Sequence, residues 1–396
     1  MSIRLPRIAF SYKLFIINGS QKPMRIVLTG GGSGGHTFPL IAVAQALRAK
    51  DPSVELFYIG VRGQLFAQTQ KAFETEKIPA RYIFAGKLRR YASFSHITDL
   101  FFKMPISMIQ SLWHVLWLMP DAVFSKGGYG SVPVVIAARL YRIPVLTHES
   151  DARPGWANRI IGKISTRVAV SYPTARDYFL AENVVMTGNP IRDDIMGGSA
   201  DAARTHFHFT TSKPVILVMG GSQGSQLIND AILSIFPDLL THAQVIHSTG
   251  AQHHETVIHQ AAEQGIKEGR EGYVAVPFLE RDALRDAYAL ADLVITRAGA
   301  NTITEIAANK KPAIIIPLTN AANDHQRMNA YALAQIGGAL VLEEANLGKN
   351  ILLEKVTTLL TNQDLRTRMV ESMGTFYHAD AAEKIARGLE EIVQGA

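Results

Sequence analysis

A glycine-rich stretch close to the start of the chain has the composition of a phosphate-binding loop. Residues 30–36 read GGGSGGH and follow the apolar run RIVLT, which predicts a buried strand. The next run, FPLIAVAQALRAK, has the spacing of a helix. Backbone amides at such a strand-to-helix junction favour an anionic or strongly polar ligand. The stretch predicts a phosphate contact, with a ligand-free tight turn as the alternative.

His36 closes this loop and could accept a proton. The positive end of a helix lowers the pKa of a histidine near its first turn, which would keep the His36 imidazole neutral at pH 7. A neutral imidazole can take a proton from a hydroxyl group during a reaction. A purely structural histidine is the alternative that the pattern leaves open.

The same loop also has the spacing of a dinucleotide-binding motif. Gly30, Gly32 and Gly35 match the pattern G-x-G-x-x-G. That motif needs an acid at the end of the second strand to hold the ribose hydroxyls. The second predicted strand, VELFYIG, carries its one acid, Glu55, near its start. The prediction of an NAD site therefore lacks one of its two requirements.

Two later stretches repeat this kind of chemistry. The loop GGSQGS at residues 220–225 follows the apolar run KPVILVM, and Ser222, Gln223 and the loop amides would suit a phosphate at the start of a second helix. The stretch RAGANTITEIA contains Thr302 and Glu305. Their spacing fits a helix capping box, or a cleft in which Glu305 accepts two ribose hydroxyls. The sequence leaves both interpretations open.

Polar residues also follow two other strand-like runs, in THESDARPGWANR and NDHQRMNA. Such residues at the carboxyl ends of parallel strands line the ligand crevice of open α/β sheets. The second stretch has too few ligands at matched spacing for a metal, so contacts to a sugar or diphosphate are the better prediction. The polar residues are His148, Glu149, Asp151, Asn158, Asp324, His325, Gln326 and Asn329.

The elements that must position these residues alternate between strand and helix in both halves of the chain. This alternation predicts parallel sheets with helices on both faces. We expect an α/β protein of two Rossmann-like domains that face a cleft. The first domain would comprise residues 24–190 plus 379–396, where the amphipathic helix DAAEKIARGLEEIV returns, and the second would comprise residues 191–378.

Composition limits the alternatives. A chain of 396 residues exceeds the usual single core, and 47% hydrophobic residues are typical of a packed globular protein. The absence of cysteine excludes disulfides, cysteine-ligated metals and thiol catalysis, and it is compatible with a reducing cytosol. Residues 1–23 carry four basic residues and no acid, so the net charge of +6 gives little support for nucleic-acid binding. We expect this tail to be disordered, with a membrane-surface contact as the alternative.

A basic and aromatic segment lies within residues 85–120. Lys87, Arg89 and Arg90 precede an apolar stretch that includes Trp113. A buried pair of helices accounts for part of this stretch. Aromatic and aliphatic side chains beside a basic cluster also suit the surface of an anionic membrane. We therefore expect some of these residues to face lipid.

Seven motifs occur in the order GGSGGHTFPLIAVA, FSKGGYGSVP, THESDARPGWANR, GNPIR, GGSQGS, RAGANTITEIA and DHQRMNA. From residue 24 to its C-terminus the chain thereby resembles the MurG family of bacterial N-acetylglucosamine transferases. The resemblance implies a GT-B fold, UDP-GlcNAc as donor, undecaprenyl-linked lipid I as acceptor, lipid II as product and no cofactor. It also implies a peripheral protein of peptidoglycan synthesis, cell shape and cell division. That protein would lie at the cytoplasmic face of the bacterial inner membrane and could have partners in a cell-wall or division complex.

The resemblance also implies roles for single residues. Glu305 would hold the ribose, Ser222 would meet the diphosphate, and the backbone of Leu279 would read the uracil. In the first domain, the sugar and the acceptor diphosphate would be covered by Ser33, Gly34, Gly35 and His36. The remaining donor contacts would come from Arg192, Ala300, Asn301, Thr302, His325 and Gln326.

The implied reaction is a single inverting displacement, in which the muramyl 4-hydroxyl attacks the anomeric carbon from the face opposite UDP. It needs a general base and stabilisation of the leaving diphosphate. The second helix N-terminus could stabilise the diphosphate, so no metal is required. His36 is the first candidate for the base and Glu149 is the second.

One position departs from the family pattern. The family usually reads His-Glu-Gln-Asn where this chain has His148, Glu149, Ser150 and Asp151. An ionised aspartate only accepts hydrogen bonds, and it adds negative charge near a diphosphate. Either a neighbouring cation compensates this charge or sugar recognition differs.

Three other functions compete with this interpretation. Another GT-B transferase would use a different UDP-sugar or lipid acceptor, and the glycine, GNPIR and DHQ motifs together argue against it. A UDP-sugar 2-epimerase would consume UDP-GlcNAc without an acceptor and would not need the basic and aromatic segment. A membrane-tethered sugar-nucleotide binder would bind UDP tightly without any transfer.

Overall fold

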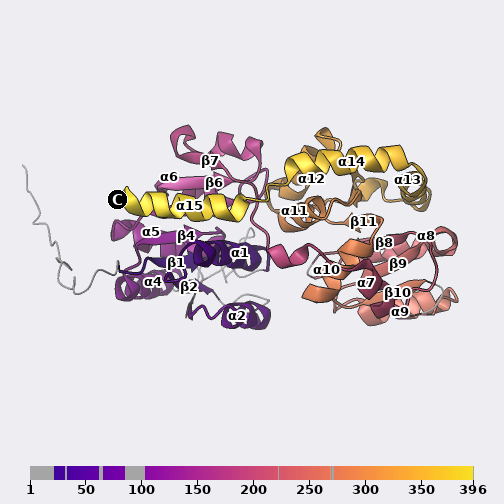
Figure 1. Cartoon of the computed structure of the whole chain (residues 1–396), viewed down its shortest axis with the longest axis horizontal. Helices are drawn as coiled ribbons and strands as arrows, with labels where there is room; N and C mark the ends of the chain where they lie inside the picture. Colours follow the sequence, from indigo (N-terminus) through magenta and orange to yellow (C-terminus); the bar gives the residue numbers. More distant parts are fainter. Residues whose placement is uncertain are drawn as a thin grey trace, which may run out of the picture.

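The structure of the chain is a computed structural model that describes residues 22–31, 34–61, 66–84, 103–221, 223–267, 269 and 272–395. These residues form two lobes, each built on one parallel sheet (Figure 1). The predicted fold class, two Rossmann-like domains with helices on both faces of parallel sheets, is confirmed. Most of the predicted N-terminal extension, residues 1–21, lies outside the described residues.

The sheet of the first lobe has the order β3-β2-β1-β4-β5-β6-β7. Consecutive strands are joined by helices, which keeps every pair of neighbours parallel. The described strands are β1 (Arg25–Thr29), β2 (Glu55–Val61), β3 (Ala80–Ile83), β4 (Ala122–Ser125), β5 (Val145–Glu149), β6 (Arg167–Val170) and β7 (Val184–Met186). The helices are α1 (Gly34–Lys50), α2 (Phe66–Thr75), α4 (Met104–Leu118), α5 (Val132–Leu140) and α6 (Trp156–Ile164).

The sheet of the second lobe has the order β10-β9-β8-β11-β12-β13, again all parallel. Its described strands are β8 (Val215–Met219), β9 (Gln244–Ser248), β10 (Tyr273–Val276), β11 (Leu293–Thr296), β12 (Ala313–Ile315) and β13 (Leu340–Val341). The helices are α7 (Ala200–His206), α8 (Gln226–His242), α9 (His254–Glu263), α10 (Arg281–Leu290), α11 (Ala300–Ala308), α12 (His325–Gln335), α13 (Lys349–Thr361) and α14 (Gln363–Phe376).

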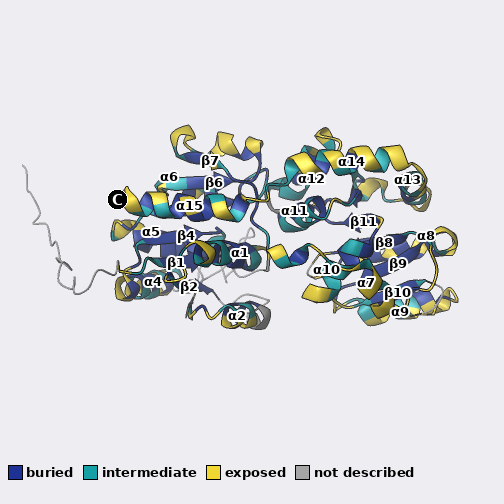
Figure 2. Cartoon of the chain, in the orientation of Figure 1, coloured by how far each residue is buried: buried dark blue, intermediate teal, exposed yellow. Residues whose placement is uncertain are grey.

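Both faces of each sheet are buried, because helices cover them on both sides (Figure 2). On the first sheet, Ile26 and Leu28 of β1 pack under α1, whereas Val27 between them packs under α4 and α5. Alternate strand residues point to opposite faces, so a strand buried on both sides favours apolar residues at successive positions rather than at every second one. This explains why β1 contains the continuous apolar run IVL and β8 the continuous apolar run VILVM, rather than alternating patterns.

The last helix, α15 (Ala381–Gln394), lies on the first lobe although it follows the second lobe in sequence (Figure 1). Its apolar residues Ile385 and Leu389 belong to the core formed by α1 and β1. Ion pairs of Lys50 with Glu390 and of Arg167 with Glu391 border this contact. The chain therefore passes between the lobes twice.

The apolar runs RIVLT, VELFYIG and KPVILVM form β1, β2 and β8, but β3, β7 and β13 have no counterpart among the runs that predicted strands. Each of these three strands lies at the edge of its sheet. An edge strand pairs on one side only and is less buried, so it needs no long apolar run. Their burial is accordingly incomplete, as in β3 and β13.

Candidate active site

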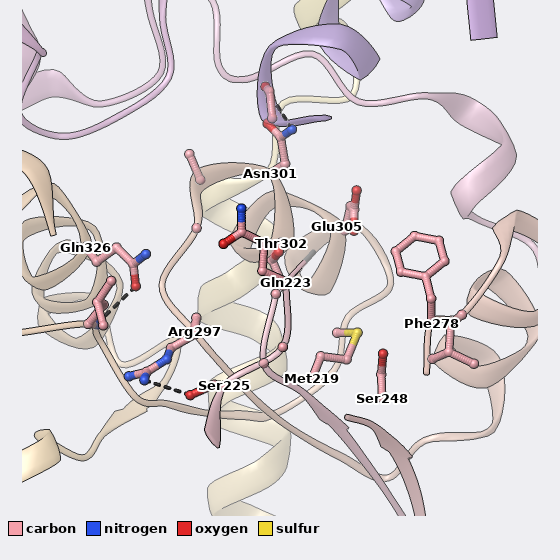
Figure 3. A pocket seen from close by; sticks show the side chains of 18 of the residues that line it. Met219, Gln223, Ser225, Ser248, Phe278, Arg297, Asn301, Thr302, Glu305 and Gln326 are labelled. Carbon is pink, nitrogen blue, oxygen red and sulfur yellow. Dashed lines mark hydrogen bonds between the residues drawn. The ribbon is translucent and has the colours of Figure 1, made fainter. Parts of the chain in front are cut away.

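One cleft of about 770 Å³ lies between the lobes, at the carboxyl ends of strands from both sheets (Figure 3). Gly35, His36, Ser150 and Asp151 line it from the first lobe. Parallel strands bring their carboxyl ends to one edge of a sheet, which is where open α/β folds bind ligands. Of the residues predicted from the sequence, the cleft brings together Gly35, His36, Asp151, Gln223, Leu279, Ala300, Asn301, Thr302, Glu305 and Gln326.

His36 is the third residue of α1, because this helix begins at Gly34. Its Nδ1 lies 3.3 Å from the carbonyl oxygen of Lys126. A carbonyl only accepts, so this hydrogen bond puts the proton on Nδ1 and leaves a lone pair on Nε2. Burial and the charge of Lys126 lower the pKa of His36 to about 4, so the imidazole is neutral at pH 7. A side chain at Gly31 would approach Nε2 to 3.3 Å, so a glycine there leaves room beside this nitrogen.

Glu149 ends β5 and is 2% exposed. Its Oε1 accepts a hydrogen bond from the Asp151 amide (2.8 Å), and its Oε2 accepts one from Nδ2 of Asn158 (2.7 Å). Asn158 in turn accepts from the amide of Gly128, whose φ is +82°. Burial and the nearby Asp151 raise the pKa of Glu149 to about 7. Glu149 therefore links the loop after β5, which lines the cleft, to the loop after β4 through Asn158.

Asp151 is bonded across the two lobes. Its Oδ1 accepts a hydrogen bond from Nδ2 of Asn329 on α12 (2.8 Å), and Oδ1 of Asn329 accepts one from the amide of Ala152 (2.8 Å). Asn329 is fully buried, so the expected contact of this residue with a sugar or diphosphate is wrong. His148 is also fully buried and bonds the carbonyl of Gly188 (3.0 Å) rather than facing the crevice.

Glu305 lies on α11, with Gly299 at the N-cap and no side-chain cap at this helix start. Thr302 is therefore inside the helix, and the capping-box alternative is wrong. The hydroxyl of Tyr288 donates to Oε2 of Glu305 (3.2 Å). Burial raises the pKa of Glu305 to about 7, against opposite effects of Arg192 and Tyr288. The carboxylate of Glu305 thus lines the cleft while its Oε2 is hydrogen-bonded to Tyr288.

The second glycine loop, residues 220–225, leads into α8. Ser225 is the N-cap, and its hydroxyl accepts from the amide of Ile228 (3.4 Å). Gly224 has a φ of +76°, and a side chain there would come within 2.3 Å of the Thr249 carbonyl oxygen. The glycine is thus required by a close approach of two backbone segments. Gly220, Gly221 and Gln223 of this loop line the cleft at the helix N-terminus, where an anion is favoured.

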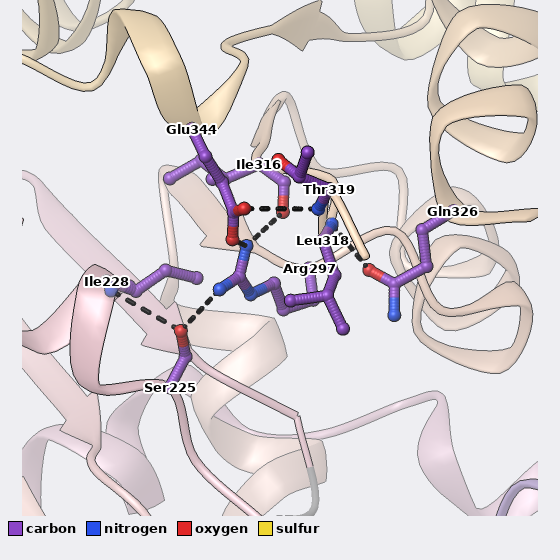
Figure 4. Close-up of polar contacts among 8 residues, drawn as sticks. All are labelled: Ser225, Ile228, Arg297, Ile316, Leu318, Thr319, Gln326 and Glu344. Atoms are coloured by element: carbon purple, nitrogen blue, oxygen red, sulfur yellow. Dashed lines mark hydrogen bonds and ion pairs between the residues drawn. The ribbon is translucent and has the colours of Figure 1, made fainter. Parts of the chain in front are cut away.

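Arg297 is a cleft residue that sequence reasoning did not select. It follows β11 and is 9% exposed. Its guanidinium donates to Oγ of Ser225 (2.7 Å), to Oε1 of Glu344 (2.6 Å) and to the carbonyl of Ile316 (3.2 Å) (Figure 4). Glu344 also accepts from the Thr319 amide (3.1 Å). The sequence feature that could have identified Arg297 is its position, because it is a charged residue directly after a buried strand, at the start of the stretch RAGANTITEIA.

The remaining predicted residues lie beside the cleft or outside the described chain. Arg192 stacks its guanidinium 4.2 Å from the ring centre of Phe38, a cleft residue. Gly34 opens α1, and His325 opens α12 next to Gln326, whose Oε1 accepts from the Leu318 amide (3.0 Å). The predicted residues outside the described ones are Ser33, Ser222, Lys87, Arg89 and Arg90.

Helix α4 presents an apolar face to solvent. Trp113 is 59% exposed and Trp117 is 66% exposed, and the guanidinium of Arg81 lies 5.9 Å from the ring centre of Trp117. Ile106, Ile109 and Leu116 are exposed on the same helix. Among the described residues no helix has both the length and the apolar character needed to cross a membrane. The described side chains also contain no group of three or more histidines and acids that could hold a metal ion.

Comparisons with known proteins match both lobes. The model of the glycosyltransferase family 28 N-terminal domain matches residues 26–170, and that of the family 28 C-terminal domain matches residues 215–385. A UDP-N-acetylglucosamine--N-acetylmuramyl-(pentapeptide) pyrophosphoryl-undecaprenol N-acetylglucosamine transferase of Lachnospira eligens is 38% identical over 367 residues, which are 91% of this chain and 97% of the relative.

Two solved structures share the arrangement of the lobes. A crystal structure of Acinetobacter baumannii MurG is 27% identical, with a TM-score of 0.71, covering 93% of this chain and 100% of that one. A UDP-GlcNAc 2-epimerase from Neisseria meningitidis, bound to UDP-GlcNAc, has a TM-score of 0.68 but only 13% identity over 93% of this chain and 100% of that one, so it shares the fold alone. By its two family domains and its nearly full-length relatives, this chain belongs to glycosyltransferase family 28 and, within it, to the MurG family of N-acetylglucosamine transferases.

Proposed function

We propose that this protein transfers N-acetylglucosamine from UDP-GlcNAc to the muramyl 4-hydroxyl of lipid I and thereby makes lipid II. The observation that carries the proposal is that one cleft is lined by residues of both lobes. Gly35 and His36 come from the motif expected at the acceptor, and Gln223 and Glu305 come from the motifs expected at the donor. Its volume of about 770 Å³ suits a nucleotide sugar together with the end of an acceptor. The name of the Lachnospira eligens relative gives UDP-N-acetylglucosamine and an N-acetylmuramyl-(pentapeptide) pyrophosphoryl-undecaprenol as the substrates of that relative. The product would enter peptidoglycan synthesis, and through it cell-wall biogenesis, cell shape and cell division.

The donor would lie in the second lobe. Its ribose hydroxyls would bond the carboxylate of Glu305, and its uracil would meet the backbone of Leu279 beside the exposed ring of Phe278 (Figure 3). Its diphosphate would lie over the amides of the glycine loop and the N-terminus of α8. Asn301 already joins the lobes, since its Nδ2 donates to the Gly35 carbonyl (3.1 Å), so it could contact the sugar only at this junction.

Replacement of Glu305 by alanine should raise the KM for UDP-GlcNAc about 10- to 100-fold and change kcat much less. Hydrogen bonds to a charged group contribute about 1.5–3 kcal/mol each, and bonds to the ribose are made in ground state and transition state alike. Steady-state kinetics and UDP titration calorimetry measure the effect. Glu263→Ala on the exposed face of α9 is the matched control. An unchanged KM and UDP affinity would remove Glu305 from the donor site.

The acceptor hydroxyl would be activated by His36. In the proposed step, the muramyl 4-oxygen forms a bond to the anomeric carbon while the bond from that carbon to the UDP oxygen breaks. The hydroxyl proton passes to Nε2 of His36, and the electron pair of the broken bond stays on the diphosphate, where the α8 amides stabilise it. Attack from the face opposite UDP inverts the anomeric configuration.

Glu149, the second candidate for the base, fits a positioning role better. Both of its oxygens accept hydrogen bonds from its own lobe, and the residue is 2% exposed. A base must reach the proton that it removes, directly or through one water. His36 lines the cleft, which supports it as the base.

Transfer of radiolabel from UDP-GlcNAc to a lipid I analogue tests the proposed function. The expected result is acceptor-dependent labelling of the lipid product with release of UDP. Loss of UDP-GlcNAc without any acceptor would support a 2-epimerase instead, and tight UDP binding with no transfer would support a binder. UDP-glucose and UDP-galactose as competing donors test the choice of sugar.

We further propose that the first lobe binds the cytoplasmic face of the bacterial inner membrane through α4 and the preceding basic segment. The exposed face formed by Ile109, Trp113 and Trp117 supports this, because aromatic and aliphatic side chains enter the interface between headgroups and acyl chains. Lys87, Arg89 and Arg90 would add attraction to anionic lipids. Membrane binding through this face would leave the other surfaces of the protein accessible to partners of a cell-wall or division complex.

Charge reversal at Lys87, Arg89 and Arg90 should weaken binding to anionic vesicles strongly, because each basic residue near such a surface contributes about 1 kcal/mol. Trp113→Ser should weaken binding to all vesicles. Co-sedimentation with liposomes of varied phosphatidylglycerol content measures both effects. Ile351→Ser, which removes an exposed apolar side chain from α13 of the other lobe, is the control. Binding that ignores anionic lipid and survives the charge reversal would rule out the basic patch.

A further inference from the structure

A chain of buried polar side chains lies behind the second glycine loop, residues 220–225, and joins α8 to β9 and β10. His247 lies in β9 and is fully buried, whereas Ser248, which ends this strand, lines the cleft (Figure 3). Asn229 lies near the start of α8 and is also fully buried. Buried polar groups are costly unless each is hydrogen-bonded. These two side chains therefore need partners, and they are each other's.

The Thr249 carbonyl fixes the direction of each hydrogen bond in this chain of side chains. Nδ2 of Asn229 donates to it (3.0 Å), so Oδ1 of the same amide is an acceptor. Nε2 of His247 lies 3.0 Å from this Oδ1 and must carry the proton. Burial, together with the charge of His254, lowers the pKa of His247 to about 3, so at pH 7 the ring is neutral and Nδ1 keeps its lone pair. The hydroxyl of Tyr273 therefore donates to Nδ1 (3.2 Å).

Thr249 is the residue on which these hydrogen bonds converge. Its amide and its hydroxyl both donate to the Val276 carbonyl at the end of β10 (3.0 and 3.1 Å). Because the hydroxyl donates there, it accepts from Nδ1 of His254 on α9 (3.2 Å). Thr249 is fully buried, and α8, α9 and β10 all hold it.

The second glycine loop packs against this fixed residue. A side chain at Gly224 would come within 2.3 Å of the Thr249 carbonyl oxygen, and one at Gly250 would come within 2.6 Å of the Gln223 carbonyl oxygen. The two backbone segments are thus in close contact, so the position of Thr249 determines that of Gln223 and Gly224. Both of these loop residues line the cleft at the N-terminus of α8, where an anion is favoured.

We propose that Asn229 and His247 are positioning residues for the donor diphosphate, because their hydrogen bonds hold the Thr249 backbone against which the second glycine loop is shaped. They act from behind the loop and do not touch the ligand. A loop held in its binding conformation need not be ordered when the anion binds. The effect should be confined to the diphosphate, since the uridine would lie against Glu305 and Leu279. The ligand is identified as a nucleoside diphosphate by the proposed function, on which this inference rests.

Two substitutions of His247 separate this role from packing alone. Leucine leaves Oδ1 of Asn229 unpaired and should lower the affinity for UDP about 10-fold. Glutamine can place an amide nitrogen where Nε2 lies, so it keeps this hydrogen bond and should hold UDP affinity within about threefold of the wild type. Uridine affinity should change less than about threefold in both variants. Titration calorimetry measures UDP binding, and competition against UDP measures uridine binding.

The matched control is His242→Leu, at the exposed end of α8, which should leave both affinities unchanged. Equal losses of UDP and uridine affinity in His247→Leu would overturn the proposal, because they would mean that the whole donor site is disturbed. Failure of glutamine to preserve UDP affinity would also overturn it.

Asn229→Leu tests the second member of the pair. It leaves the Nε2 proton of His247 and the Thr249 carbonyl unpaired, so it should lower UDP affinity about 10-fold and leave uridine affinity unchanged. In the double variant Asn229→Leu/His247→Leu both side chains are apolar, so the loss should be smaller than the product of the two single losses. Single losses that simply multiply would mean that the two residues do not act together.

Nitrogen NMR of the wild-type protein tests the same network if a leucine variant does not fold. The ring signals of His247 are identified by their absence from His247→Gln. At pH 7 they should show a proton on Nε2 and none on Nδ1, and UDP should shift them whereas uridine should not. A proton on Nδ1, or signals that UDP leaves in place, would contradict the proposal.

The transfer assay separates this inference from the proposed function. If the wild type bound UDP but transferred no sugar, the proposed function would fail while the titrations still decided the role of Asn229 and His247. If the wild type transferred sugar and the leucine variants kept their UDP affinity, the positioning role alone would fail. A wild type that bound no UDP would exclude both.

Discussion

His36→Ala should lower kcat of the transfer reaction about 10²- to 10⁴-fold, the usual contribution of a positioned general base, with little change in the KM for UDP-GlcNAc. The neutral imidazole, the hydrogen bond from its Nδ1 to the Lys126 carbonyl and its place in the cleft are the physical reasons. Steady-state rates at saturating donor and acceptor measure the loss.

The control for this variant is His259→Ala, which removes an exposed histidine that is ion-paired with Glu263 on α9. Its rate should equal that of the wild type. UDP titration of His36→Ala checks that the donor site stays intact. Near-normal turnover of His36→Ala at saturating substrates would mean that another group removes the proton, and Glu149 would then be the remaining candidate.

The pKa of His36 also predicts the acid side of the pH profile. Burial and Lys126 lower this pKa to about 4, so kcat/KM should fall only as the pH approaches that value. The lowered pKa of His36 also affects stability. Between pH 6.5 and about 4 the unfolded chain binds a proton at His36 and the folded chain does not, so the free energy of unfolding decreases as the pH falls. Over this pH range the free energy of unfolding of His36→Ala should therefore decrease less than that of the wild type.

Arg297→Met should destabilise the second lobe by about 3–5 kcal/mol, the cost of removing one partner of a buried ion pair. Methionine keeps the aliphatic stem but loses the bonds to Ser225, Glu344 and the Ile316 carbonyl (Figure 4). Burial opposes ionisation of Glu344, but the bonds from Thr319 and Arg297 prevail and lower its pKa. Without Arg297 this carboxylate is left partly buried beside the start of α8.

Chemical denaturation measures the loss, and the double variant Arg297→Met/Glu344→Gln should recover part of it because it removes the stranded charge. Lys349→Ala, which breaks an exposed ion pair with Asp238, should change stability by less than about 1 kcal/mol. UDP affinity should fall together with stability in Arg297→Met, because Ser225 caps the helix beneath the glycine loop. A stable Arg297→Met protein would mean that the network contributes little net energy.

The interior strands and one edge strand, β10, could be predicted from the sequence, whereas the other three edge strands could not. The centre of β1, IVL, and the whole of β8, VILVM, are apolar at successive positions because helices cover both faces of their sheets, and these runs are visible in the sequence. β3, β7 and β13 pair on one side only, so their residues satisfy a weaker requirement that many loops also satisfy.

The candidate site divides in the same way. The glycine loops, the stretch around Asp151 and the helix of Glu305 each follow a strand, so parallel pairing alone brings them to one edge of their sheets. The orientation of α12 in the fold, however, places Gln326 in the lining of the cleft and buries Asn329. Both side chains are polar and they lie three residues apart, so no local pattern separates them.

Local apolar runs and motifs of fixed spacing are enough to predict the two-domain α/β fold, the strand ends that carry the chemistry and the family resemblance. The pairing of polar groups, in contrast, depends on how the elements pack in three dimensions. Arg297 and Glu344 are far apart in the chain, as are Asp151 and Asn329, and each pair meets only through the packing of the elements that carry it. The partner of a buried charge is chosen by the packing of whole elements, which the spacing of residues along one segment does not encode.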